Sequence, residues 1–441
     1  MFLRSAMHAR IAARSGNVEK LKILMTQKSF LINSTCTDGY TLLHLATWYG
    51  HVSVVKLLLK KEGIHVNKAN VSGETALHRA AKNGHCNIME LLLREDTRVN
   101  DPNKAGVTPL LAASERGHPK VIQMLLDRVD IDVNLTNNNG ETALFLAARE
   151  GHSKVVEQLL RKSEIQVNLA MNDDGITPLF AAAHNGHHKV VELLLGKSDT
   201  HVNQATNNGT TPLCIAVHNG HDNVVELLLG KNDIQVNLAM NNGATPLLFA
   251  ARNGNHKIVE LLLRRNDIQV NLAWKDGATP LFIAAQNGHL KVVELLMGNS
   301  NTQVNQAMNN GATPLHVAAK KGHEEVVDLL LRRNDILANQ AWNTGNTALH
   351  EAAGYGHEKV VKMLLRKDGI QVNVLNGSGR TPLMIASGGR HGKIVEMILR
   401  TPGMRGIAWH GWRPKRRSTP HQHHKPDIRF GVGLSGPTRK F

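Results

Sequence analysis

Residues 309–331 have the sequence NNGATPLHVAAKKGHEEVVDLLL, and this stretch decides the fold. Thr313 followed by Pro314 is typical of a helix start, because threonine caps free N–H groups and proline fits the first helical position. Gly322 ends that helix, since glycine tolerates the positive φ of a helix stop. Apolar residues recur at helical spacing on both sides of Gly322. The stretch therefore predicts two short antiparallel helices, preceded by a tight turn at Gly311.

The same unit recurs along most of the chain. Glycines equivalent to Gly311 follow one another at intervals of 33 to 35 residues, and in the first ten units a second glycine follows eleven residues later. In the eleventh unit, Arg390 stands at that second position. The turn glycines are Gly39, Gly73, Gly106, Gly140, Gly175, Gly209, Gly243, Gly277, Gly311, Gly345 and Gly379. Such a period predicts a solenoid of stacked units, which grows in one dimension.

This pattern resembles the ankyrin repeat, whose signature is T-P-L-H-x-A in a period near 33 residues. Here the segment is TPLHVA at residues 313–318. The resemblance covers about residues 5–400 and implies an all-α repeat solenoid, in which stacked helix-turn-helix units with β-hairpin loops form an elongated curved arc. We expect an N-terminal capping repeat at 1–34, an array of eleven units of about 34 residues at 35–400, and a basic disordered C-terminal tail at 401–441.

The chain departs from the family pattern at two positions of the unit. Where the family has an aspartate at the hairpin, four units have Met240, Trp274, Met308 and Trp342, so the geometry of the hairpin tip cannot be carried over. The histidine of T-P-L-H is kept in four units and is replaced by an apolar residue or cysteine in the others, which exchanges a polar link for apolar packing. The histidines that remain are His44, His78, His316 and His350.

The composition excludes several classes of protein. Aromatic residues make up only 4% of the chain, so the core must consist mostly of Leu, Val, Ile and Ala. No apolar run approaches the roughly 18 residues that span a bilayer. Cys36, Cys86 and Cys214 lie in three different units, which argues against a disulfide framework and favours a reducing compartment. We therefore expect an intracellular protein, cytoplasmic or nuclear, that is not secreted and has no transmembrane segment.

The N-terminal residues 1–17, MFLRSAMHARIAARSGN, contain arginines and no acid, as a transit peptide would. The register of the repeat accounts for them better, because Ala12 and Gly16 stand where Ala46 and Gly50 stand one unit later. We therefore expect a cap of two helices here, without a leading hairpin.

Residues 401–441 differ in composition from the repeats. They carry nine Lys or Arg against one acid, Asp427, and so half of the chain's net charge of +16. A segment of this kind buries little apolar area, and we expect it to be disordered and to contribute nothing to the fold. It contains a basic run that resembles a nuclear-import or anionic-surface motif, although such runs in tails often only solvate the chain. The run consists of Arg413, Lys415, Arg416 and Arg417.

The 25 histidines raise the hypothesis of a metal or catalytic site. Ten of them follow the position of the second glycine, one in each of ten units, and neighbours about 10 Å apart are too far from each other to share a metal bound at roughly 2.1 Å. The resemblance implies that they cap the second helix and bridge units. They are His51, His85, His118, His152, His187, His221, His289, His323, His357 and His391. The tail histidines, His410, His421, His423 and His424, have no cysteine or acidic pair beside them, and we predict no metal site and no cofactor.

The resemblance places partner contacts at five positions of the unit: the two residues before the turn glycine, the one after it, and the two before the second glycine. In the middle units these positions form a polar strip rich in amides. The strip contains Asn207, Asn208, His218, Asn219, Asn241, Asn242, Arg252, Asn253, Gln286, Asn287, Asn309 and Asn310. Near the N-terminus, Tyr40, Trp48 and Tyr49 gather in one unit. Because aromatic residues dominate interface hot spots, we expect binding at this end first, the alternative being that the three rings pack under the cap.

The sequence contains no nucleotide-binding, hydrolase or paired zinc motif. We therefore predict a non-enzymatic protein–protein interaction scaffold or adaptor, without a small-molecule substrate, that binds one or more proteins on the concave face formed by the hairpins and first helices. The alternative is a nucleic-acid or anionic-membrane binder that acts through the basic tail only.

Overall fold

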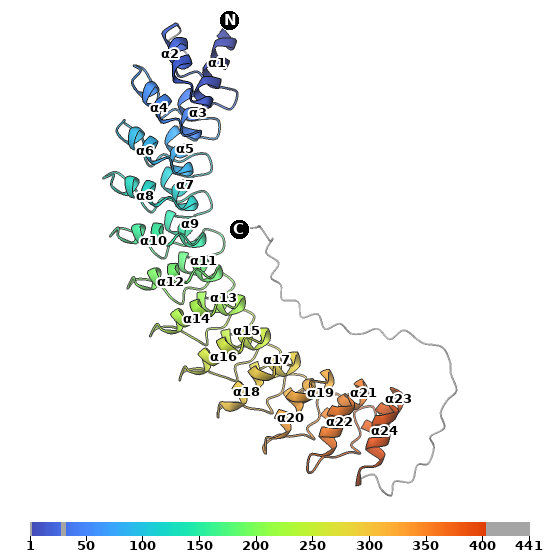
Figure 1. The fold of residues 1–441 in the computed structure, drawn as a ribbon. Coiled ribbons are helices and arrows are strands. Elements are labelled where there is room, and N and C mark those ends of the chain that lie inside the picture. The colour runs from blue at the N-terminus through green and yellow to red at the C-terminus, as the bar shows by residue number, and fades with distance from the viewer. Residues whose placement is uncertain (1, 28–31, 403–441) are drawn as a thin grey trace.

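The computed structural model describes residues 2–27 and 32–402, and within them the chain forms 24 helices in antiparallel pairs and no strand (Figure 1). The predicted all-α solenoid is confirmed. The helices are α1 (Phe2–Ser15), α2 (Val18–Gln27), α3 (Leu42–Trp48), α4 (Val52–Leu59), α5 (Ala76–Asn83), α6 (Cys86–Leu93), α7 (Pro109–Arg116), α8 (Pro119–Leu126), α9 (Ala143–Arg149), α10 (Ser153–Leu160), α11 (Pro178–His184), α12 (His188–Leu195), α13 (Pro212–Asn219), α14 (Asp222–Leu229), α15 (Pro246–Asn253), α16 (His256–Leu263), α17 (Pro280–Asn287), α18 (Leu290–Gly298), α19 (Pro314–Lys321), α20 (Glu324–Leu331), α21 (Ala348–Tyr355), α22 (Glu358–Leu365), α23 (Pro382–Gly388) and α24 (Gly392–Leu399). We number the units 1 to 11 by their turn glycines, so that unit 1 holds α3 and α4, and unit 11 holds α23 and α24.

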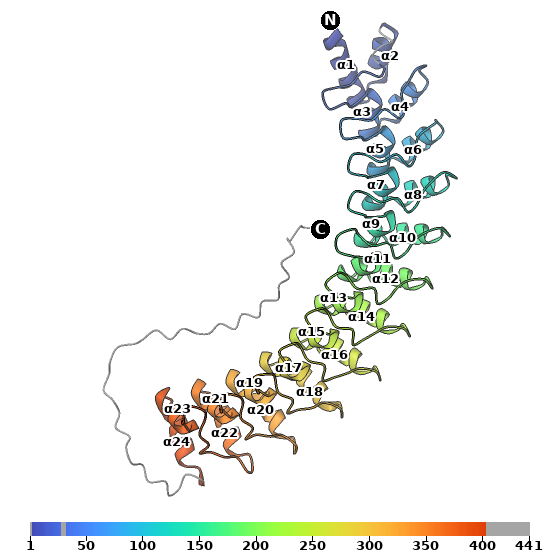
Figure 2. The same cartoon turned by 180° about the vertical axis from the view of Figure 1, so that it is seen from behind.

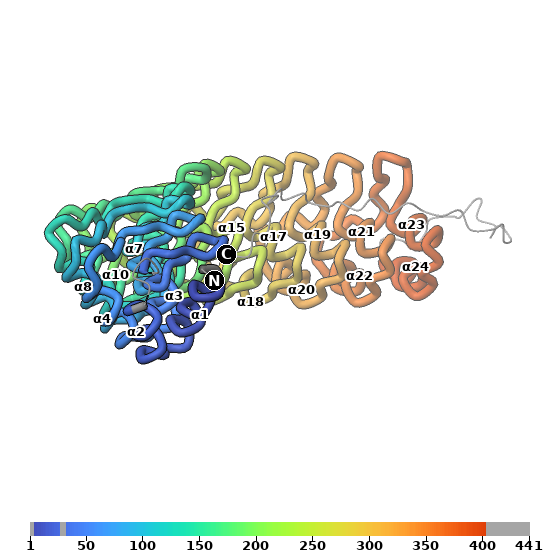
Figure 3. Tube along the Cα trace, turned by 90° about the horizontal axis from the view of Figure 1, so that it is seen from above, coloured from blue at the N-terminus to red at the C-terminus, as the bar shows by residue number. Residues whose placement is uncertain are grey.

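The odd-numbered helices line the concave side of the arc and the even-numbered helices its convex side (Figures 1 and 2). Each odd-numbered helix packs on the next odd-numbered one, and the even-numbered helices from α2 to α24 do the same. Seen from above, the units follow one another without a break (Figure 3). The first two helices, α1 and α2, precede unit 1, as the expected cap would. The expected tail lies outside the described residues except for Thr401 and Pro402, so its disorder stays a prediction.

Unit 9 shows why these residues form this pair of helices. The Thr313 side chain accepts the N–H of His316, Pro314 opens α19, and Gly322 ends it with φ 76°. Val326, Val327 and Leu330 of α20 are buried against the core. The same apolar positions in every unit join into one continuous core along the array.

The turn that precedes each first helix closes without strands. In unit 9 the N–H of Gly311 donates to the carbonyl of Met308 at 2.8 Å, and the N–H of Met308 donates to the carbonyl of Ala312 at 2.9 Å. In the described part of the chain, the bridge between Thr136 and Thr142 is the one β pairing. The expected β-hairpin loops are therefore tight turns, too short for a ladder of strand hydrogen bonds.

The departures from the family pattern at the hairpin are compensated within the turn. In units 2, 3, 4 and 11 the first turn residue is asparagine, and its side-chain oxygen accepts two backbone N–H groups, as Asn70 does from Ser72 and Glu74 at 2.9 Å. In unit 9 that residue is Met308, which packs on the core, and Asn310 accepts the N–H of Ala312 instead, at 3.0 Å. The turn geometry is thus kept while the first residue becomes apolar.

A line of asparagines joins each unit to the next by two hydrogen bonds. The Asn237 amide nitrogen donates to the carbonyl of Asp267 at 2.6 Å, and its oxygen accepts the N–H of Gln269 at 2.9 Å. The other asparagines with this pair of bonds are Asn33, Asn67, Asn100, Asn134, Asn168, Asn203, Asn271, Asn305 and Asn339. Asn373 of unit 11 occupies the same position and makes no such pair of bonds to the part of the chain that the structure describes.

Replacing Asn237 with alanine should lower the local stability of units 6 to 8 by about 1–2 kcal/mol, because two hydrogen bonds are lost. Asn373→Ala is the matched control and should change the stability by less than about 0.5 kcal/mol, as other substitutions on the surface do. Amide hydrogen exchange of Gln269 and its neighbours measures the difference. Equal effects of the two substitutions would show that the asparagine stabilises its own loop and not the contact between units.

The histidine that follows the second glycine also bridges two units, as expected. The His357 ring donates from Nε2 to the carbonyl of Lys320 at 2.9 Å and lies against Gly322, where a Cβ atom would come within 2.5 Å of Nδ1. All ten histidines of this position make such a bond to the preceding unit. They stand at the N-cap of the second helix, but their side chains accept no cap hydrogen bond. The expected position at the cap of the second helix is thus confirmed, but the ring bonds to the neighbouring unit and forms no cap hydrogen bond.

Arg390 is the one non-glycine residue with positive φ in the described part of the chain, at 62°. The Arg390 side chain is exposed, whereas nine of the ten equivalent glycines lie against a histidine ring of the next unit. The left-handed conformation still costs on the order of 1–2 kcal/mol for a residue with a Cβ atom. Met384 and Leu399 of the same unit are 47% and 43% exposed, so the outer side of unit 11 lacks the cover that other units have.

We expect unit 11 to open before the rest of the array. Amide exchange should be much faster in residues 380–400 than in residues 311–333, and Arg390→Gly should slow it by removing the left-handed strain. Equally slow exchange in the two segments would contradict this and would mean that something else covers the C-terminal end.

Candidate functional site

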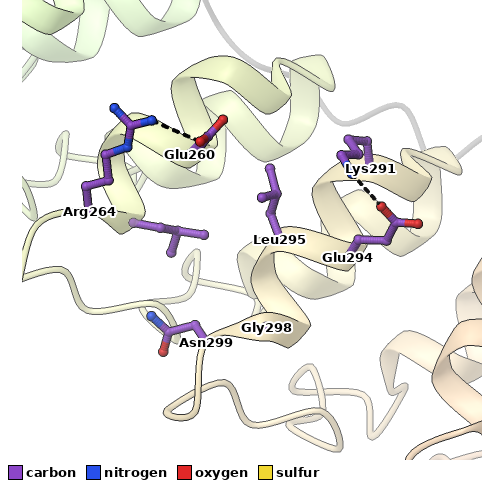
Figure 4. A pocket seen from close by; sticks show the side chains of 8 residues that line it. Glu260, Arg264, Lys291, Glu294, Leu295, Gly298 and Asn299 are labelled. Carbon is purple, nitrogen blue, oxygen red and sulfur yellow. Dashed lines mark hydrogen bonds and ion pairs between the residues drawn. The ribbon is translucent and has the colours of Figure 1, made fainter.

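The described residues offer little that suggests catalysis. No group of three or more His, Cys, Asp or Glu among them is arranged to hold a metal ion. No helix in the same residues is long and apolar enough to cross a membrane. A shallow hollow lies on the convex side between α16 and α18 (Figure 4). Its charged groups are tied within each helix, Arg264 to Glu260 and Lys291 to Glu294, both at 2.9 Å.

The aromatic residues of unit 1 meet on the concave side, as the sequence predicted. Trp48 lies between Tyr40, with ring centroids 5.6 Å apart, and Tyr49, at 6.1 Å. The Arg79 guanidinium of unit 2 stands 4.2 Å from the Trp48 ring centroid, where a cation–π attraction holds it. Trp48 is 39% exposed and Tyr49 42%. The three rings thus form one continuous cluster in which Trp48 and Tyr49 are exposed.

The aromatic cluster also contacts the N-terminal cap, as the alternative interpretation expected. The Arg14 guanidinium of α1 stands 5.2 Å from the Tyr49 ring, and Arg79 donates to the Tyr40 hydroxyl at 2.6 Å and pairs with Glu74. The cluster therefore connects the cap, unit 1 and unit 2 while it exposes two of its rings.

The amide strip of the middle units divides into two groups. In the first group the amide nitrogen donates to the backbone of the preceding unit, so these side chains hold the array together. The group consists of Asn207, Asn219, Asn241, Asn253, Asn287 and Asn309. In the second group, Asn208, Asn242 and Asn310, the oxygen stabilises the turn, and the amide nitrogen has no partner among the described residues. Only the second group leaves donors free at the exposed hairpin tips.

His218, Arg252 and Gln286 continue the strip along the ends of the first helices. The His218 ring meets Phe249 edge to face at 5.0 Å, and Arg252 stands 5.9 Å from the Trp274 ring. Burial lowers the pKa of His218, and the nearby Arg252 lowers it further. The strip is therefore mainly neutral here, with Arg252 as its cation.

The histidine of T-P-L-H closes a box with the threonine that caps its helix. In unit 1 the His44 Nδ1 accepts the N–H of Thr41 at 3.2 Å, so Nε2 carries the proton and donates to the carbonyl of Glu74 at 2.8 Å. Burial lowers the pKa of His44 and of His316 to about 4. Both side chains are therefore neutral at pH 7, and His44 links its unit to the next.

Acid should destabilise the array through these residues. An unfolded histidine has a pKa of about 6.5. Between pH 6.5 and 4 the unfolded state therefore binds protons that folded His44 and His316 do not. The free energy of unfolding decreases as the pH is lowered through this range. We expect a loss on the order of 2 kcal/mol for each residue at pH 5. His316→Leu, which copies Leu248 of unit 7, should reduce this loss in urea unfolding at pH 7 and pH 5. An unchanged pH response would contradict the assignment.

A second aromatic cluster lies at the other end of the concave face, in units 9 and 10, and the sequence analysis missed it. The Lys320 ammonium group stands 5.2 Å from the Trp342 ring centroid and 5.4 Å from that of Tyr355. Tyr355 is 58% exposed. Because Tyr355 directly precedes Gly356, as Tyr49 precedes Gly50, applying the contact positions to every unit would have found it.

The basic run of the tail, Arg413, Lys415, Arg416 and Arg417, lies outside the described residues. Its role as a targeting or anion-binding motif stays a prediction.

A family model described as ankyrin repeats, in three copies, matches overlapping segments that extend from residue 3 to residue 405. The segments are residues 3–70, 62–137, 91–170, 129–206, 165–240, 198–273, 235–308, 267–340 and 333–405. No curated protein matches the sequence.

Proposed function

The chain belongs to the ankyrin-repeat family, whose repeats generally mediate protein–protein interactions, and on this premise we propose that it is a non-enzymatic scaffold or adaptor that holds a partner protein on its concave face. The observation that carries the proposal is the exposed aromatic cluster of unit 1. Large rings that are already held in place bury much area at little cost in conformational entropy, and they are the residues that dominate interface hot spots.

The neighbouring contacts support the choice of this cluster. Arg79 and Arg14 fix the rings of Trp48 and Tyr49 before a partner arrives, which reduces the ordering cost of binding. The free amide groups of Asn208 and Asn242 continue along the same face and offer hydrogen bonds to a partner that extends beyond unit 1. Aromatic anchors with adaptable polar contacts around them are the usual composition of a protein interface.

The alternative function, binding of nucleic acid or an acidic membrane, depends on the tail. Its support is the +8 net charge of residues 401–441, half of that of the whole chain. Binding of this kind weakens steeply with salt, whereas an aromatic interface does so much less.

The test is recovery of bound proteins with the full chain and with the Trp48→Ala, Tyr49→Ala double variant, at low and high salt. The proposal predicts a defined protein that the wild-type chain retains at high salt and that the double variant loses. Nucleic acid or acidic vesicles bound equally by both chains, and released by salt, would favour the tail function instead.

A further inference from the structure

We propose that units 9 to 11 form a second contact site on the concave face, which takes an acidic segment of a partner protein with a large apolar side chain beside its carboxylates. The inference rests on the proposed function and names the chemistry of the partner at a place distinct from the aromatic cluster of unit 1.

The apolar part of this site is formed by α21 and α23. Tyr355, at the end of α21, is the most exposed aromatic residue in the described part of the chain. Next to it, Gly354 lies against Ile385 of α23, since a Cβ atom at Gly354 would come within 2.9 Å of the Ile385 Cγ2. Gly388 follows on α23, and a Cβ atom there would meet nothing within 4 Å. Ile385 is half-buried, so the end of α21, where Tyr355 stands, borders an apolar step with open space at Gly388.

A basic residue beside this apolar step has no ion pair among the described residues, although charged residues at the equivalent position of other units do. In unit 2 the residue after the turn glycine, Glu74, pairs with Arg79 on the first helix, and in unit 4 Glu141 pairs in the same way with Arg149. In unit 11 that position holds Arg380, which has no ion pair among the described residues. The first-helix positions that hold the arginine of this ion pair in units 2 and 4 are occupied in unit 11 by Ile385 and Gly388, which carry no charge.

The other cations of the site lie at the end of α19. Lys321 is exposed and has no ion pair within the described residues. Lys320 is 4.0 Å from Glu351, which is 4% exposed and also accepts the Asn346 amide at 2.7 Å. Glu351 is the one acid at the contact and first-helix positions of units 9 to 11, and it is already engaged. A carboxylate brought by a partner would supply the missing charge.

The occupant is therefore an acidic peptide segment and not the chain's own tail. Residues 403–441 carry nine basic residues and one acid, so they share the sign of Lys320, Lys321 and Arg380. The Lys320 ammonium group between the Trp342 and Tyr355 rings holds the aromatic wall in place. Tyr355 then contacts the apolar side chain of the partner while Lys321 and Arg380 bind the carboxylates beside it.

The experiment is fluorescence anisotropy of the labelled peptide EELFEEE with the full chain, compared with QQLFQQQ, EEGGEEE and a single-stranded oligonucleotide of equal charge. We expect EELFEEE to bind at least tenfold more tightly than the other three. Tyr355→Ala, and separately Lys321→Ala with Arg380→Ala, should weaken it at least tenfold. Asn241→Ala with Asn242→Ala and the Trp48→Ala, Tyr49→Ala variant are the controls and should leave the affinity unchanged.

Equal binding of EELFEEE by wild type and by both variants of units 9 to 11 would overturn the site and would assign the peptide to the basic tail. Equal binding of the oligonucleotide, or of EEGGEEE, would overturn the peptide chemistry in favour of general anion binding. Loss of the partner in the unit 1 variant, together with a failed peptide test, would leave the proposed function in place and remove only this second site.

Discussion

Replacing Trp48 and Tyr49 together with alanine should weaken binding of the partner protein by roughly 100-fold. Each ring is an anchor of the kind that costs more than about 1 kcal/mol when truncated, and a loss of about 1.4 kcal/mol at each ring, tenfold apiece, corresponds to a factor of this size. The loss should appear mainly as faster dissociation, because contacts made after encounter are removed. Titration of the identified partner against wild-type and variant chains measures it.

Two controls separate binding from folding. Asn241→Ala with Asn242→Ala changes the middle of the same face and should weaken binding by less than about tenfold, because amides at a wet surface contribute less than buried rings. Amide exchange in units 1 and 2 must stay similar in the aromatic variant, since Arg14 and Arg79 rest on these rings. Equal losses in the two double variants would move the main site to the middle units.

Gly322→Ala should destabilise units 9 and 10 by about 3 kcal/mol, which is the largest effect that we expect on stability. The left-handed backbone at φ 76° costs on the order of 1–2 kcal/mol for alanine. The new Cβ atom would also come within 2.5 Å of His357 Nδ1 and displace the ring from the carbonyl of Lys320, a loss of about 1 kcal/mol. Urea unfolding and amide exchange of residues 311–365 measure the change.

Two other glycines separate these causes. Gly220 has the same left-handed backbone, but the next unit has Asn255 in place of the histidine, and the nearest atom to a Cβ would be 3.5 Å away. Gly220→Ala should therefore cost only about 1–2 kcal/mol. Gly298 of α18 has no positive φ and no atom within 4 Å, so Gly298→Ala should stabilise by about 0.5–1 kcal/mol. Equal losses at Gly322 and Gly220 would show that the histidine ring adds nothing.

The local rules of the repeat could be derived from the sequence because they act within a few residues. The threonine cap, the proline at the first helical position and the left-handed glycine each depend on neighbouring positions, and unit 9 has all three where they were expected. Even Arg390, which replaces the usual glycine, keeps the left-handed backbone conformation of this position.

The contacts between units could not be derived in the same way, because they join residues about 30 to 38 positions apart. Asn237 was visible in the sequence, but its two bonds to Asp267 and Gln269 depend on how closely two units stack. The close stacking of units also determines that the Asn241 side chain donates to the backbone carbonyl of Asn207, so that this amide is not free to bind a partner protein. Six of the nine asparagines predicted to contact a partner hold the array together in this way.

The most direct test of the proposed scaffold role is site-specific photo-crosslinking in the full chain. A photoreactive phenylalanine placed at Asn242 on the concave hairpin tips, or at Lys257 on the convex helix α16, samples two exposed positions on opposite faces. We predict a crosslink to one defined protein from position 242, its loss when Trp48 and Tyr49 are alanine, and no such product from position 257. A product of equal yield from position 257, or crosslinks to nucleic acid alone, would contradict it.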